Sequence, residues 1–296
     1  MLIEVINEVG NADALTFERK IAALLARGAR MEDAEVRAVL RMLSELRASL
    51  AVQLLAIPTA EKGLWKAQQL GQLRAAIDRV AASFASRYGS ALTGAVNKAW
   101  DRGDDFVRDS LSGARVTVTF AQELSRTQLE VVSQLHADLV RAVSDDFRLK
   151  AGREITMGVA GEKTPFQIMQ SVGNLLRTQP LRGEMGPIAN QAERIVRTEM
   201  NQAFSIASRV RGNEIARDVP GMLHYWRSAR DGRVRDTHAT ADSRYRPGGS
   251  PGPIPWDKPF SVGGASMRYP HDPAGGGANN ISCRCVDIQY KREWFK

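Results

Sequence analysis

The chain has 296 residues, of which 43% are hydrophobic and 25% charged, and a formal net charge of +8. These proportions are ordinary for a globular protein, and the only two cysteines, Cys283 and Cys285, are too close in sequence to staple a fold by loop closure. No window approaches the roughly 18 to 20 uninterrupted apolar residues of a membrane span, and the acidic start lacks the basic region of a signal peptide, so we expect a soluble, non-secreted protein without a membrane partner.

The first two thirds of the chain indicate a series of amphipathic helices. Two of the helical segments end in a glycine, Gly28 and Gly89, that we expect to cap its helix. His136 lies beside the apolar stripe of a third segment, and we expect it at the surface or at the boundary of the core. The segments with apolar residues at helical spacing are 14–28, 31–55, 61–88 and 129–149.

Further signals divide the helical region. Residues 113–120 alternate between apolar and polar types, which favours a strand or an extended connector. Thr164 and Gln167 form a capping box that begins a helix. A long helix is expected over 187–218, and we place the domain boundary in the glycine- and proline-containing loop at 180–187.

After residue 218 the composition becomes rich in glycine and proline, with strand-like segments at 223–227 and 285–290. The predicted fold class is therefore mainly α, with a long-helix N-terminal region, 1–183, followed by a small α+β C-terminal module, 187–296.

The paired cysteines are the main chemical signal. Residues i and i+2 of a strand point to the same face, so Cys283 and Cys285 would present two sulfurs at a separation suited to tetrahedral zinc. His238 and His271, each in a loop-like segment, are candidates for the remaining ligands. The alternatives are two small apolar residues packed beneath a loop, or a redox pair. Further oxygen donors would be Asp236, Asp242 and Asp272.

Residues 227–246 surround His238 with arginines and aspartates. A catalytic interpretation makes His238 a general base oriented by Asp236 or Asp242, but no nucleophile accompanies it in the sequence. We therefore favour a polar loop held by arginine–carboxylate bridges. The charge of +8 suits a polyanionic partner, although acids and bases alternate as they do on solvated helix faces.

Several motifs in the C-terminal third share an order and spacing over about residues 187–286. They are Arg197-Thr198-Glu199, Tyr225-Trp226, Asp231 to His238, Phe260, Tyr269 to Pro273 and Cys283-Arg284-Cys285. This set resembles the head morphogenesis domain of phage Mu F-like minor head proteins. The resemblance implies a minor capsid protein of a tailed phage, located in the capsid interior after assembly in the host cytoplasm. It implies the portal protein and the major capsid or scaffolding protein as partners, and a role in head assembly and DNA packaging or ejection.

The resemblance also bears on the metal. Many relatives have two cysteines where this chain has Arg235 and His238, and with the terminal Cys-x-Cys these look like a metal site. A structural zinc in this chain would be held by His238, Cys283 and Cys285, with His271 as the fourth ligand. The structural motif residues are Arg197, Glu199, Asp231, Arg235 and Asp236.

We therefore expect an assembly protein and no catalytic residues. The alternatives are a metal-dependent enzyme using His238 with zinc at Cys283 and Cys285, and a protein that binds DNA without sequence preference. Arg197 and Glu199 lie two residues apart on the expected helix, so we expect them to tie it to separate loops. Glu199 is expected to accept from backbone amides or from an arginine of residues 227–246.

Overall fold

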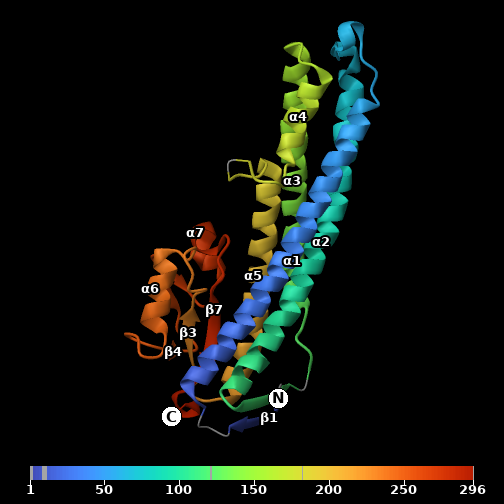
Figure 1. The fold of residues 1–296 in the computed structure, drawn as a ribbon. Helices are drawn as coiled ribbons and strands as arrows, with labels where there is room; N and C mark the ends of the chain where they lie inside the picture. Colours follow the sequence, from blue (N-terminus) through green and yellow to red (C-terminus); the bar gives the residue numbers. More distant parts are fainter. Residues whose placement is uncertain (1–2, 9–11, 121, 182, 296) are drawn as a thin grey trace. The chain divides into compact units, whose positions relative to one another are not determined.

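The computed structural model describes residues 3–8, 12–120, 122–181 and 183–295. Its α-helices are α1 (Ala14–Leu55), α2 (Leu70–Gly113), α3 (Thr127–Ala160), α4 (Pro165–Leu175), α5 (Pro187–Asp218), α6 (Asp236–Tyr245) and α7 (Gly276–Asn280). Its strands are β1 (Ile3–Glu8), β2 (Val116–Phe120), β3 (Leu223–Arg227), β4 (Ile254–Pro255), β5 (Phe260–Val262), β6 (Ala265–Met267) and β7 (Val286–Tyr290). The predicted fold class, mainly α with a small α+β module at the C-terminal end, is confirmed (Figure 1).

Contacts divide the chain into two compact units. Unit 1 contains residues 1–32, 95–132 and 197–296, and unit 2 contains residues 33–94 and 133–196. Helices α1, α2, α3 and α5 each contribute residues to both units. The divisions therefore fall inside continuous helices, whereas the sequence predicts one boundary in the loop at 180–187.

Unit 2 is helical throughout its regular structure and buries an apolar interior. Phe84 and Tyr88 stack with their ring centroids 5.2 Å apart, and the Tyr88 hydroxyl donates to the Ala192 carbonyl over 2.9 Å. His136 is buried in this unit with 3% exposure, so the expected surface position is wrong. Fully buried apolar side chains of unit 2 include Leu43, Leu54, Leu73, Phe84, Phe147, Ile155, Ile168 and Val196.

Several predicted helix limits need correction. Gly28 and Gly89 lie inside α1 and α2 instead of ending a helix. A mid-helix glycine costs only about 1 kcal/mol relative to alanine, which packing of a long helix readily offsets. The helix expected over 61–88 begins at Leu70, because short 3-10 turns precede it.

Other local predictions are confirmed. The Thr164 hydroxyl accepts from the Gln167 amide over 3.3 Å at the start of α4, as the capping box requires. The extended segment at 113–120 contains β2, and the two predicted C-terminal strands are β3 and β7. Strand β1, which pairs antiparallel with β2, is an element that the sequence analysis does not include.

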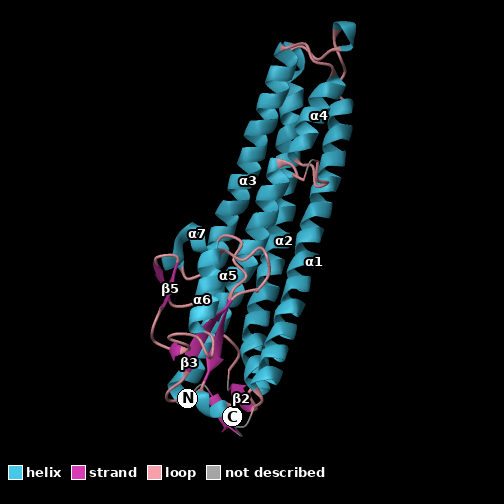
Figure 2. Ribbon diagram, turned by 60° about the vertical axis from the view of Figure 1, so that its left-hand side comes forward, coloured by secondary structure: helices cyan, strands magenta, loops and turns pink. Residues whose placement is uncertain are grey.

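Unit 1 contains the strands, shown in magenta in Figure 2. Strand β3 lies between β4 and β7 in an antiparallel sheet, and β5 and β6 form a hairpin. Tyr225 and Trp226 of β3, Phe260 of β5 and Ile288 of β7 have no exposed surface. The sheet and its connections therefore hold a separate core that positions the C-terminal motifs.

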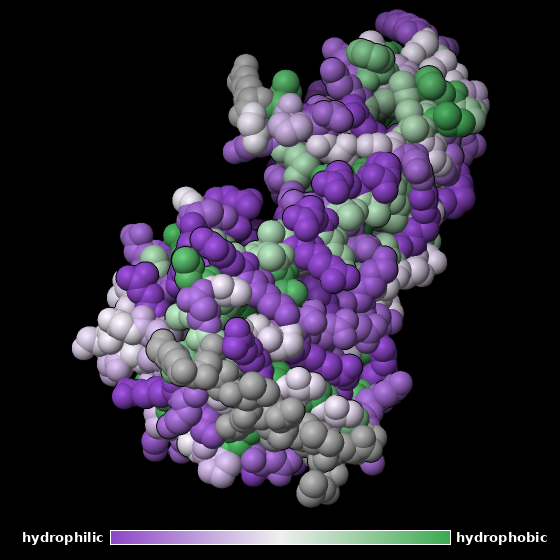
Figure 3. All heavy atoms as spheres, turned by 60° about the horizontal axis from the view of Figure 1, so that its bottom comes forward, coloured by the Kyte–Doolittle hydropathy of each residue, from purple (hydrophilic) through white to green (hydrophobic). Residues whose placement is uncertain are grey.

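The face of the molecule drawn in Figure 3 is mostly hydrophilic, with apolar residues in smaller groups among the polar ones. Within the described part of the chain, no helix has the length and apolar character needed to cross a membrane.

Candidate metal centre

His238, Cys283 and Cys285 come together in the interior of unit 1. Their donor atoms all lie within 4.8 Å of one another, and each side chain is at most 4% exposed. His238 Nδ1 is 3.3 Å from Cys285 Sγ and 3.6 Å from Cys283 Sγ. A tetrahedral zinc with ordinary bond lengths would place nitrogen and sulfur about 3.6 Å apart, so the donor spacing fits this ion.

The local backbone differs from the expected one. The cysteines precede β7 in a loop where Ser282 has a φ of 55°, and the Cys285 amide donates to Cys283 Sγ over 3.4 Å. His238 lies on α6, in a segment expected to be a loop. The cysteine pair therefore presents both sulfurs to one imidazole without being part of a regular strand.

The hydrogen bonds around Asn279 set the tautomer of His238. Asn279 Nδ2 donates to the Gly275 carbonyl over 3.0 Å, which leaves Oδ1 facing His238 Nε2 at 3.3 Å. Because an amide oxygen only accepts, Nε2 carries the hydrogen and neutral His238 directs its Nδ1 lone pair at the two sulfurs. Such an outer hydrogen bond is the usual support of a metal-binding histidine.

The thiols of Cys283 and Cys285 differ in pKa. The hydrogen bond from Cys285, together with the electrostatic effect of His271, lowers the pKa of Cys283 well below the usual thiol value despite its burial. The same hydrogen bond and burial raise the pKa of Cys285 well above that value. The thiolate, which is the form that binds a metal, is thus favoured at Cys283 over Cys285.

His271, the predicted fourth ligand, lies against the cluster but outside the three-donor group. Its Nε2 is 3.0 Å from the Cys283 carbonyl oxygen, and the ring is fully buried. Its Nδ1 has no hydrogen-bond partner within the described part of the chain. Asp272 accepts from Arg268 over 2.8 Å, and so serves the loop instead of the cluster.

The residues predicted to orient His238 have other roles. Asp236 is exposed in the first turn of α6, where its negative charge interacts favourably with the positive end of the helix dipole. Asp242 Oδ2 accepts from the Ser228 hydroxyl over 2.7 Å, and its Oδ1 accepts from Arg230 over 2.8 Å. Asn279 takes the orienting place, which weakens the general-base interpretation of His238.

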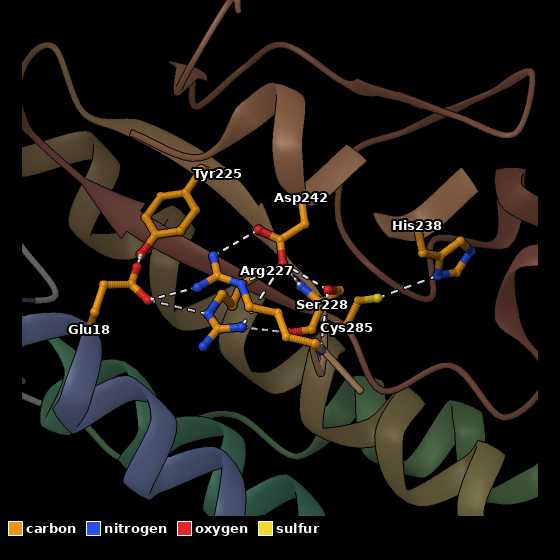
Figure 4. A network of polar contacts seen from close by, with 8 residues as sticks. Glu18, Tyr225, Arg227, Ser228, His238, Asp242 and Cys285 are labelled. Carbon is orange, nitrogen blue, oxygen red and sulfur yellow. Dashed lines mark hydrogen bonds and ion pairs between the residues drawn. The ribbon is translucent and has the colours of Figure 1, made fainter. Parts of the chain in front are cut away.

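Figure 4 shows this polar network extending from Asp242 to Glu18 on α1. Glu18 accepts from the Tyr225 hydroxyl over 2.8 Å and lies 3.4 Å from Arg227. Burial would raise the pKa of Asp242, but hydrogen bonds from Arg230 and Ser228 lower it below its usual value. Arginine–carboxylate bridges therefore hold this segment as predicted, although residues 236–245 are helical.

The arginine between the cysteines fixes their loop. Arg284 donates to both carboxylate oxygens of Asp231 over 2.6 and 2.8 Å, and this pair lowers the pKa of Asp231 to about 2. Arg235 donates to the Ile281 carbonyl in the same loop. Two of the predicted motif residues thus anchor the segment that carries the cysteines.

The Arg-Thr-Glu motif connects elsewhere. Arg197 pairs with Glu32 on α1, and its expected contact with a loop stays a prediction. The Thr198 hydroxyl accepts from the Ser282 amide over 3.1 Å, next to Cys283. Glu199 is buried at 6% exposure, and the donor predicted for it stays a prediction.

Two residues of the site environment escaped the sequence analysis. Asn279 has no signal in the sequence, because its contacts depend on three separate segments meeting. His224 is fully buried, with Nδ1 2.9 Å from Asp287 Oδ1 and Nε2 3.0 Å from the Lys258 carbonyl oxygen. Its position between Leu223 and Tyr225, in a run of large apolar residues, could have indicated a histidine inside a sheet.

Together these residues form a buried site that could hold a metal ion through two sulfurs and one imidazole. Comparison of the chain with protein families, curated proteins and solved structures finds no match.

Proposed function

We propose that the protein is a minor head protein of a tailed phage, and that its metal centre is a structural zinc site. The observation that carries the structural assignment is the closure of the site. The hollow beside His238, Cys283 and Cys285 has a volume of only about 10 Å³, and all three side chains are buried. A cavity this small barely admits one water molecule, whereas a catalytic zinc keeps a position open for water and substrate.

The fit of zinc rests on this chain's own donors. Two sulfurs, one with a depressed pKa, and an imidazole whose second nitrogen is hydrogen-bonded make a ligand set that zinc prefers. His271 is the proposed fourth donor because its Nδ1 is buried without a hydrogen-bond partner in the described part of the chain. A bound zinc would supply folding free energy to the C-terminal module, since the unfolded chain offers no preformed site.

The assignment to phage heads draws on where the resembling motifs meet. Thr198 of the Arg-Thr-Glu motif binds Ser282, and Asp231 binds Arg284, so both support the cysteine loop. His238 reaches the same loop from α6. Segments up to 84 residues apart in sequence thus support one local structure, which favours a shared structural role over separate catalytic ones.

In this role the protein works by its position in the capsid interior and not by turnover. The portal protein is the proposed principal partner, with the major capsid or scaffolding protein as a second. Contact with packaged DNA would be independent of sequence and would weaken steeply with salt, because only backbone charge is read.

Particle analysis tests this function directly. Deleting the gene should leave capsid protein synthesis intact and yield fewer infectious particles, with defects in assembly or DNA delivery. The protein should copurify with portal and be present in few copies per head. Normal infectivity of particles shown to lack the protein would reject the proposal, as would its absence from both procapsids and mature heads.

Elemental analysis tests the metal centre separately. We expect about one zinc per chain, and Cys283→Ser with Cys285→Ser should release it and expose the C-terminal module to proteolysis. Ile288→Val in β7 is the control, because it loosens the same core by about 0.5–1.5 kcal/mol without removing a donor, and it should keep its zinc. A folded, metal-free wild type that does not bind added zinc would exclude the centre and leave the packing alternative.

A further inference from the structure

A cavity of about 250 Å³ lies within unit 1, and it shares Ala229 and Arg284 with the small hollow at the metal centre. Helices α1, α2 and α5 contribute to its wall, together with the segment that follows β3. The residues of its lining that matter below are Glu32, Arg102, Phe204, Arg227, Asp231 and Arg284. Its charged lining distinguishes it from an ordinary packing void, which is apolar.

Arg102 is held firmly in this wall. Its guanidinium carbon lies 4.2 Å from the centroid of the Phe204 ring, in a cation–π contact. A methyl group on Gly28 would collide with the Arg102 guanidinium, so the glycine in the middle of α1 leaves the space that the arginine fills. Contacts with α1 and α5 therefore place the side chain, which is partly exposed.

Despite this placement, Arg102 lacks an acceptor. Its Nε is buried and has no hydrogen-bond partner in the part of the chain that the structure describes. Burial also lowers the pKa of Arg102 to about 10, with Glu32 opposing the shift. A buried guanidinium nitrogen without an acceptor is costly, because water has been removed from its N–H group and nothing replaces it.

The other charged groups of the cavity already have partners. Glu32 accepts from Arg197 and from Asn201. Arg284 binds Asp231 through two hydrogen bonds. Arg227 lies 3.4 Å from Glu18 and donates to the Ser228 carbonyl. Among the charged residues of the described lining, Arg102 is the one without an ion pair, although the Nε of Arg227 also lacks a hydrogen bond.

We propose that this cavity binds a small oxyanion, a carboxylate or phosphate group, through Arg102. The planar fork of a guanidinium matches two oxygens of either group, and the hydrogen bonds are strengthened by charge. The volume is below the range typical of sites for drug-sized ligands, which favours an anion of a few heavy atoms over a nucleotide. The site is independent of the phage assignment and of the zinc.

The test titrates the full chain with inorganic phosphate and, separately, with succinate, each against sodium chloride at equal ionic strength. Calorimetry and thermal unfolding should show binding of at least one anion beyond the chloride control, and the arm that responds identifies the group. Arg102→Met should weaken that binding about tenfold or more, as expected for loss of a charged hydrogen-bond donor. Lys98→Met, an exposed lysine one turn earlier on α2, should leave it unchanged.

Two further measurements keep the result decisive. Without anion, Arg102→Met should unfold at the same temperature as wild type or higher, because it removes a buried Nε–H group that has no acceptor. Should Arg102→Met not fold, Gly28→Ala serves instead, since its methyl group displaces the guanidinium and should also weaken binding. Failure of both anions to bind beyond chloride, or equal binding by wild type and both variants, would overturn the proposal.

Discussion

The interiors of unit 2 and unit 1 differ in what fills them. In unit 2 the buried side chains are overwhelmingly apolar, and pairs such as Arg148–Asp78 lie about half exposed, at 48% and 58%. In unit 1 charged groups enter the interior itself. The buried aspartate, glutamate and arginine side chains that the structure describes all belong to unit 1, and are Glu32, Glu199, Arg211, Arg227, Asp242, Asp272 and Asp287.

The difference shows how each unit is specified. An apolar helical interior accepts many residues of similar volume, because dispersion and burial do not depend on direction. A buried polar network is stable only when each donor meets its acceptor, so it fixes one arrangement of its segments. Unit 1 carries the motifs and the candidate metal centre, and its network is the means by which distant segments are held in register.

Removing a carboxylate from each unit should give the largest contrast. Asp242→Ala deletes the acceptor of Arg230 and Ser228 and leaves the buried Arg227 without the carboxylate that lies near it. We therefore expect the free energy of unfolding to fall by about 3–5 kcal/mol. Asp78→Ala, in unit 2, should cost about 0–1 kcal/mol, because its pair with Arg148 is exposed.

Urea unfolding measures both variants, with fluorescence of the buried Trp226 reporting unit 1 and that of Trp65 reporting unit 2. Variants that retain one tryptophan at a time separate the two signals. Equal losses for Asp242→Ala and Asp78→Ala would show that the polar interior of unit 1 is not what stabilises it.

Two glycines sharpen the contrast at the level of helix packing. A methyl group at Gly103 on α2 would lie 2.5 Å from the Phe204 carbonyl oxygen, so Gly103→Ala should destabilise unit 1 by about 1–3 kcal/mol. A methyl group at Gly152 on α3 would have no atom within 4 Å apart from its chain neighbours and the nearby backbone of its own helix. Gly152→Ala should therefore stabilise unit 2 by up to about 1 kcal/mol. Thermal unfolding checks the opposite signs, and a shift of both variants in the same direction would contradict the packing described here.

Much of the fold was predictable because local signals were strong. The capping box at Thr164 and the strands predicted at 223–227 and 285–290 depend on near neighbours. The structure has the cap and the first strand at these residues, and the second strand at Val286–Tyr290. The helix end predicted at Gly28 is wrong because this glycine leaves space for the side chain of Arg102, which is 74 residues away in sequence. In the sequence alone, such a glycine cannot be told from one that ends a helix. The division into units also depends on contacts between distant segments, which periodicity does not reveal.

The site was likewise predictable only as far as residue type and spacing allow. Residue type and spacing indicated His238, Cys283 and Cys285 as a group, and the structure brings them together. The orienting residue could not be inferred, because aspartates near His238 in sequence are more conspicuous than Asn279, which is 41 residues away. The helix at 236–245 was missed because its ten residues contain two aspartates, a serine and two threonines, which individually favour turns and caps.

The smallest expected effect concerns acid and the Asp231–Arg284 pair. The folded-state pKa of Asp231 is about 2, below its ordinary value of 3.8, because Arg284 donates two hydrogen bonds to the carboxylate. A depressed pKa means that the ionised form stabilises the fold, so this contribution is present above about pH 4 and is lost as the pH falls toward 2. Since Asp231 is 40% exposed, solvent screening keeps the contribution below about 1 kcal/mol.

Asp231→Asn isolates this contribution. Its urea midpoint should lie below that of wild type at pH 5, and the two should converge as the pH approaches 2, because protonation removes the same charge from wild type. Both proteins are compared after metal removal, since thiol protonation releases zinc over part of the same range. Asp138→Asn, which breaks an exposed pair with Arg141 in unit 2, is the matched control. In this variant the urea midpoint of unit 1 should change between pH 5 and pH 2 by as much as it does in wild type. If the difference in urea midpoint between Asp231→Asn and wild type stayed constant across this range, the pair would act through geometry and not through charge. Arg284 would then contribute to the Cys283–Cys285 loop only by fixing its position.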